Sequence, residues 1–82
     1  MSAMATFRVP DAPGYVLYAG KDRPVRIELT DAMIRLFPRT GPMLFECRRT
    51  IECAERLADL LSLQRCVLEA DALRRESQRW KW

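Results

Sequence analysis

The sequence predicts an α+β fold, in which an N-terminal antiparallel β-hairpin or meander of two to four strands precedes one long C-terminal α-helix, with or without a kink. Apolar and polar residues alternate over residues 25–29, which is typical of a strand with one buried face. From residue 49 onward, apolar residues recur instead with the α-helical period of about 3.6 residues. With 82 residues, 49% of them hydrophobic, the chain is expected to form one small domain over 1–82. It divides into an irregular lead-in at 1–13, a mainly β region at 14–47 and a helical region at 49–79.

The β-hairpin is predicted from two apolar runs and the turn-forming residues between them. Residues 15–18 are rich in side chains that favour strands, and residues 19–24 contain glycine, aspartate and proline. Six intervening residues indicate a loop longer than the minimal two-residue turn. In the second run the apolar and charged side chains point to opposite faces of the sheet, Val25, Ile27 and Leu29 to one and Arg26 and Glu28 to the other.

Residues 30–47 leave two structures open. One is a short helix capped by Thr30 and Asp31, with four apolar residues on one side: Ala32, Met33, Leu36 and Phe37. The other is a third strand over residues 33–37 after a tight bend. Residues 38–42 then break any regular element, although Thr40 and Pro42 would also suit the start of a helix. After this break Met43, Phe45 and Cys47 alternate with Leu44, Glu46 and Arg48, as in a strand, which favours a four-stranded meander.

The apolar face of the helical region changes sides near Ser62. On a helical wheel, five apolar residues after Ser62 fall opposite the apolar face of residues 51–61: Leu63, Cys66, Val67, Ala70 and Leu73. A helical hairpin with Ser62 as the N-cap of its second helix would bring both faces into one core. One long helix would instead leave the second face to a partner. Because no Gly, Pro, Asn or Asp marks a reversal, the sequence favours the long helix.

Catalytic, metal-binding and membrane functions are not predicted. The chain has no histidine, its three glycines are scattered, and no serine lies in a nucleophile-elbow motif. An odd number of cysteines without a CxxC pair indicates reduced thiols rather than a disulfide framework or a zinc site. No apolar run approaches the roughly 20 residues of a membrane span, and the start lacks a signal-peptide pattern. We therefore expect a cytoplasmic protein that is not an enzyme and binds no cofactor.

The second apolar face predicts that the chain binds other proteins. Burying its five side chains could contribute several kcal/mol at about 25 cal/mol per Å², which would support a homodimer or docking on a target. At least one of Trp80 and Trp82 should also be exposed or on a partner, because residues two apart cannot share one helical face. The size and lack of catalytic groups suit a small inhibitor or adaptor of the kind that mobile elements carry. The predicted partner-binding residues are Leu63, Cys66, Val67, Ala70, Leu73, Trp80 and Trp82.

Nucleic-acid binding is the alternative function. The net charge is +3, and twelve of the fourteen basic residues are arginine, which suits phosphate contacts. The charge is spread evenly, however, with six basic and four acidic residues in 1–42 and eight and seven in 43–82. This pattern lacks the basic block of a typical polyanion binder. The candidate residues are Arg48, Arg49, Arg56, Arg74, Arg75, Arg79 and Lys81, with Trp80 and Trp82 able to stack on bases.

Overall fold

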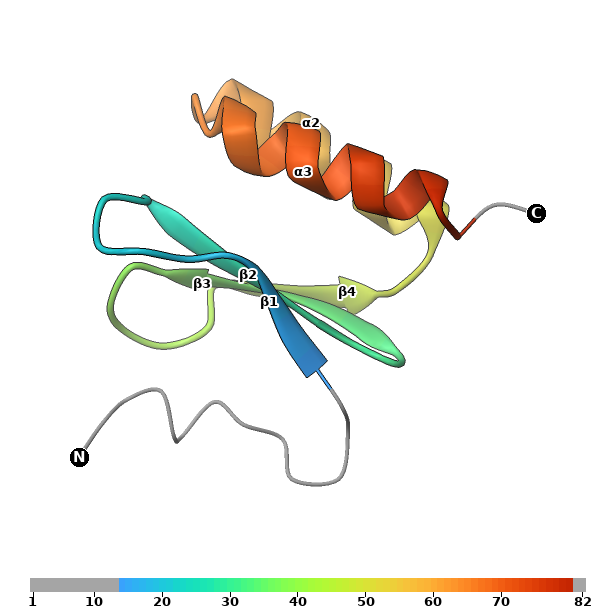
Figure 1. The fold of residues 1–82 in the computed structure, drawn as a ribbon, viewed down its shortest axis with the longest axis horizontal. Helices are drawn as coiled ribbons and strands as arrows, with labels where there is room; N and C mark the ends of the chain where they lie inside the picture. The colour runs from blue at the N-terminus through green and yellow to red at the C-terminus, as the bar shows by residue number, and fades with distance from the viewer. Residues whose placement is uncertain (1–13, 81–82) are drawn as a thin grey trace.

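The computed structural model describes residues 14–80, which form a four-stranded antiparallel sheet covered on one face by two helices (Figure 1). The strands are β1 (Gly14–Tyr18), β2 (Val25–Thr30), β3 (Met33–Pro38) and β4 (Phe45–Arg48). They lie in the sheet in chain order, so the fold begins as a simple meander. The helices are α2 (Ile51–Leu63) and α3 (Val67–Gln78). The lead-in predicted at 1–13 lies outside the described residues.

The predicted meander is confirmed, and the alternative of a short helix after Thr30 is wrong. Thr30 does act as a cap, but its side-chain oxygen accepts hydrogen bonds from the backbone N–H groups of Ala32 (3.3 Å) and Met33 (2.9 Å). These bonds close the tight turn that leads from β2 into β3. The register then pairs Leu29 with Ile34, so apolar side chains on the two strands share one face.

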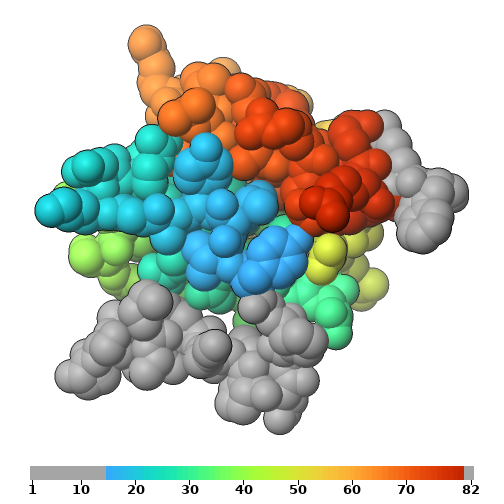
Figure 2. Space-filling view, viewed as in Figure 1, coloured from blue at the N-terminus to red at the C-terminus, as the bar shows by residue number. Residues whose placement is uncertain are grey.

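The hydrophobic core lies between the sheet and the helical layer. The sheet contributes the inward side chains of β2 and β3, and each helix contributes one face. The two helices pack against each other, and α3 also contacts β1. In the space-filling view, β1 and α3 lie next to each other on one face of the molecule (Figure 2). The buried core residues are Ile27, Leu29, Ile34, Leu36, Ala54, Leu57, Ala58, Leu61, Cys66, Ala70 and Leu73.

The prediction of one continuous C-terminal helix is wrong, because the chain reverses between α2 and α3. The backbone N–H of Cys66 donates to the carbonyl of Leu61 (2.8 Å), and that of Arg65 donates to the carbonyl of Ser62 (3.0 Å). This pair of bonds is a Schellman motif, which ends a helix with a residue in the left-handed region. Arg65 takes that role with φ of 67°. The reversal therefore occurs at an arginine, where glycine is the usual residue.

The face of the sheet opposite the helices carries both charged and aromatic side chains, and some of them are buried. Arg26 and Phe37 are cross-strand neighbours on β2 and β3, and both are buried. The guanidinium carbon of Arg26 lies 4.5 Å from the centre of the Phe37 ring, which is a cation–π contact. Beside them, Arg35 Nε donates a 2.7 Å hydrogen bond to Glu46 Oε2 between β3 and β4. Charged side chains on this face thus pack along the sheet and link neighbouring strands.

Candidate functional site

The structure divides the predicted second apolar face into buried and exposed parts. Cys66, Ala70 and Leu73 are buried in the core of the domain itself. Leu63 and Val67, on either side of the reversal, are 76% and 53% exposed. The physical reason is the turn at Arg65, which folds α3 back so that most of its apolar face meets α2 and the sheet. The helical-hairpin alternative is therefore correct, and only the residues nearest the turn remain available to a partner.

The position of the hairpin differs from the prediction. Ser62 lies inside α2, and the N-cap of α3 is Cys66 rather than Ser62.

The exposed apolar residues around the turn form a smaller candidate surface, which we call the turn surface. It comprises four large side chains from the end of α2 and the start of α3: Leu60, Leu63, Val67 and Leu68. The turn that joins the helices stands at one end of the helical layer (Figure 1). On the helical wheel, Leu60 falls on the apolar face of residues 51–61, which was expected to be covered, and Leu68 was not singled out. The closeness of both residues to the reversal was the signal that could have found them.

A second exposed apolar group lies at the start of β4. Met43, Leu44 and Phe45 are each at least 40% exposed. The loop that precedes β4 lies at the same end of the molecule as the α2–α3 turn (Figure 1). Since β4 is an outer strand of the sheet, this group borders an edge. It offers a comparison surface, equally apolar but outside the helical layer.

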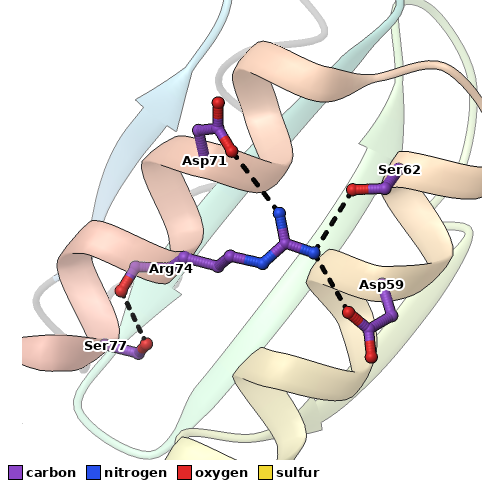
Figure 3. Close-up of polar contacts among 5 residues, drawn as sticks. All are labelled: Asp59, Ser62, Asp71, Arg74 and Ser77. Atoms are coloured by element: carbon purple, nitrogen blue, oxygen red, sulfur yellow. Dashed lines mark hydrogen bonds and ion pairs between the residues drawn. The ribbon is translucent and has the colours of Figure 1, made fainter.

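Polar contacts lock the two helices beside the turn surface (Figure 3). Arg74 on α3 reaches across to α2, where its Nη2 lies 3.0 Å from Asp59 Oδ1 and 3.3 Å from Ser62 Oγ. Its Nη1 lies 3.4 Å from Oδ1 of Asp71 on its own helix. The oxygen of Ser77 donates in turn to the carbonyl of Arg74 (2.9 Å). Arg74 is therefore committed within the chain, which makes it a poor candidate for a phosphate contact.

Arg49 is also committed within the chain, through contacts with Trp80 and β2. Its Nη1 donates a 2.9 Å hydrogen bond to the carbonyl of Thr30, and its guanidinium stacks 4.8 Å from the centre of the Trp80 ring. Trp80 is partly buried and packs against the core. Trp80 therefore belongs to the packing of the domain itself. Lys81 and Trp82 lie outside the described residues.

The other candidate arginines do not gather on one surface. Arg79 lies 3.8 Å from Glu76. The side chains of Arg48, Arg56 and Arg75 are exposed and make no hydrogen bond or ion pair with any residue in 14–80, but they belong to three different elements. The residues proposed for nucleic-acid binding that lie within 14–80 therefore do not all form one cluster.

The cysteines show no metal-binding arrangement within residues 14–80. Cys47 on β4 and Cys53 on α2 are free thiols, and Cys66 is free and buried. Burial is the main reason that the pKa of Cys47 rises to about 11, and the neighbouring thiol adds to this effect. In the described part of the chain, no group of three or more potential metal ligands occurs. Neither α2 nor α3 has the length and apolar character that crossing a bilayer requires.

Comparisons of the chain with protein-family models, with curated proteins and with solved structures gave no match. The function is therefore argued from the surfaces themselves.

Proposed function

We propose that this chain is a small non-enzymatic protein-binding module, of the inhibitor or adaptor kind, that acts through the turn surface and associates with itself there as a homodimer. The observation that carries the proposal is the exposure of Leu60, Leu63, Val67 and Leu68 around one turn. Contiguous apolar patches on small domains mark sites of protein interaction. Scattered single apolar residues would need no such explanation.

The turn surface is well prepared for binding because its backbone is already ordered. The Schellman bonds from Cys66 to Leu61 and from Arg65 to Ser62 hold the reversal. The contacts of Arg74 with Asp59 and Ser62 hold the helices together beside it. A rigid surface loses less conformational entropy on binding than a mobile loop, so more of the apolar burial appears as affinity.

A second copy of the chain is the partner that this surface suits best. A two-fold dimer pairs one patch with the same patch on its partner, and an apolar patch is complementary to itself. A chain of 82 residues also buries a smaller share of its surface than a larger domain does, so it gains stability from self-association. Three free cysteines fit a reducing compartment, so we place the protein in the cytoplasm.

Light scattering tests this proposal through the solution mass. We expect the wild type to have twice the chain mass of 9.6 kDa, and Leu63→Glu to be monomeric because the charge is placed in the apolar contact. Leu63 is mostly exposed, so this variant should keep its fold, which circular dichroism would verify. Leu44→Glu is the matched control, since Leu44 is also a leucine and mostly exposed but lies outside the turn surface. A monomeric wild type at about 100 µM, or a dimer that survives both Leu63→Glu and Val67→Glu, would contradict the proposal.

A further inference from the structure

An open groove of about 470 Å³ runs between the edge strand β1 and helix α3. It lies apart from the turn surface, beside the middle and end of α3. Figure 2 shows the two elements that form it on the same face of the molecule. Its lining residues are Leu17, Tyr18, Ala72, Arg75, Glu76 and Arg79.

A β-bulge shapes the wall that β1 gives to this groove. The register shifts between Val16 and Tyr18, because Val16 pairs with Glu28 whereas Tyr18 pairs with Ile27. In a regular strand, successive side chains point to opposite faces of the sheet. Leu17 and Tyr18 both line the groove instead. A bulge is a common way to redirect a side chain next to a binding site, and here two successive side chains contribute to one wall.

The helical wall of the groove carries a net positive charge, from two arginines and one glutamate. The side chain of Arg75 is exposed and makes no hydrogen bond or ion pair with any residue in 14–80. The Arg79 side chain is also exposed, and it forms an ion pair with Glu76 at 3.8 Å. The carboxylate of Glu76 already accepts a 2.5 Å hydrogen bond from the Tyr15 hydroxyl. A carboxylate entering the groove would therefore meet two arginine side chains and the carboxylate of Glu76, which already contacts Arg79 and Tyr15.

The backbone beside the groove is a sheet edge. The strand order places β1 outermost, and no strand among residues 14–80 pairs with its outer side. An extended peptide can add to such an edge by main-chain hydrogen bonds while a neighbouring helix contacts its side chains. We propose that the groove between β1 and α3 binds an extended, acidic segment of a partner protein, with its backbone along β1 and its carboxylates on Arg75 and Arg79. This site depends neither on the turn surface nor on dimerisation.

Fluorescence anisotropy with synthetic peptides tests the site. The probe is a fluorescein-labelled peptide of alternating glutamate and valine, about eight residues long to match an ordinary strand. We expect saturable binding to the wild type, and at least about a tenfold loss of affinity in Arg75→Glu because an attractive charge becomes repulsive. The matched control is Arg56→Glu, which makes the same change at an exposed, uncommitted arginine on α2. It should bind within about twofold of the wild type.

Two further measurements separate groove binding from general charge attraction. The same peptide with lysine in place of glutamate should not bind, and hydrogen exchange of the β1 amides should slow when the acidic peptide is added. No binding at about 1 mM peptide, an equal loss in both arginine variants, or unchanged exchange along β1 would overturn the assignment. Leu63→Glu should bind the peptide as the wild type does. If the dimer prediction fails, the peptide-binding result therefore still tests the groove independently.

Discussion

Arg23, which is partly exposed, forms an ion pair with the fully buried Glu69 and so connects the β1–β2 loop to the first turn of α3. Arg23 Nε donates a 2.7 Å hydrogen bond to Glu69 Oε2, and Arg23 Nη2 lies 2.5 Å from the same oxygen. The side chain of Glu69 has no exposed surface. The guanidinium of Arg23 also lies over the ring of Tyr18, 5.3 Å from its centre. A carboxylate in the first turn of a helix gains further from the helix dipole.

Removing Arg23 should therefore cost more stability than removing a surface partner. Arg23→Ala leaves the buried Glu69 carboxylate without its cation, and we expect a loss of about 3 kcal/mol in the free energy of unfolding. Replacing both residues, as Arg23→Met with Glu69→Leu, should recover most of this loss because no charge remains buried. Asp59→Ala, which removes an exposed partner of Arg74, should cost about 0.5 kcal/mol or less. Urea denaturation measures all three, and equal losses for Arg23→Ala and Asp59→Ala would show that burial does not matter.

The reversal at Arg65 makes a second prediction about stability. An L-residue in the left-handed region is strained by about 1 kcal/mol relative to glycine. Because Arg65 has φ of 67°, Arg65→Gly should raise the free energy of unfolding by about 0.5–1 kcal/mol. Gln64→Gly is the control: Gln64 has φ of −90°, so glycine there only adds flexibility and should destabilise the fold. If Arg65→Gly unfolds more easily than the wild type, the strain argument fails.

The sheet could be predicted from the sequence because its signal is local. Alternation in residues 25–29 shows which side chains of β2 face the core, and the turn residues around it mark the hairpin. The helical reversal carried a weaker signal. Arg65 ends α2 where glycine or asparagine would be recognised, so the capping motif was invisible in the residue types. The half-turn change of apolar face near Ser62 was the correct sign of two helices, but it fitted a long helix equally well.

The binding surfaces were harder to predict because they depend on which residues the fold leaves uncovered. Cys66, Ala70 and Leu73 have the pattern of a partner face, but the reversal covers them with α2. Glu69 has the pattern of a solvated charge, but it is fully buried and pairs with Arg23, 46 residues earlier in the chain. The β1–α3 groove depends on a bulge at Leu17, which leaves no mark in residue type. Such features follow from contacts between distant segments, which residue periodicity does not report.

The hydrogen bond between Tyr15 and Glu76 leads us to expect a loss of stability at alkaline pH. Partial burial, followed by the hydrogen bond to Glu76, raises the pKa of the Tyr15 hydroxyl above its ordinary value of 10.0. The unfolded chain therefore loses this proton at a lower pH than the folded chain. The associated stability is complete below pH 10 and decreases as the pH rises through the folded-state value. Glu76→Gln should shift the tyrosinate absorbance titration to lower pH, and an unchanged midpoint would contradict the assigned contact.

Cys47 should react slowly with alkylating reagents. Its pKa of about 11 lies about 2 units above the ordinary thiol value of 9.0, so the reactive thiolate is roughly a hundredfold scarcer at neutral pH. Iodoacetamide labelling followed by peptide mass mapping can follow this residue alone. The labelling rate of the native protein should keep rising up to about pH 11, whereas urea-unfolded protein should level off near pH 9. The same rate profile in both states would show that the fold does not protect this thiol.

Trp80 should stabilise the domain through its contact with Arg49. The indole packs against the core, and its ring lies under a guanidinium that the carbonyl of Thr30 holds in place. Trp80→Ala should therefore lower the free energy of unfolding by about 2 kcal/mol or more, mainly through lost apolar burial. Arg49→Ala, combined with Trp80→Ala in a double-mutant cycle, should give a coupling energy of about 0.5–1 kcal/mol. Arg48→Ala is the control, because the side chain of Arg48 is exposed and makes no hydrogen bond or ion pair with residues 14–80. Its coupling to Trp80→Ala should be close to zero, and equal couplings for the two arginines would show that the stack contributes nothing specific.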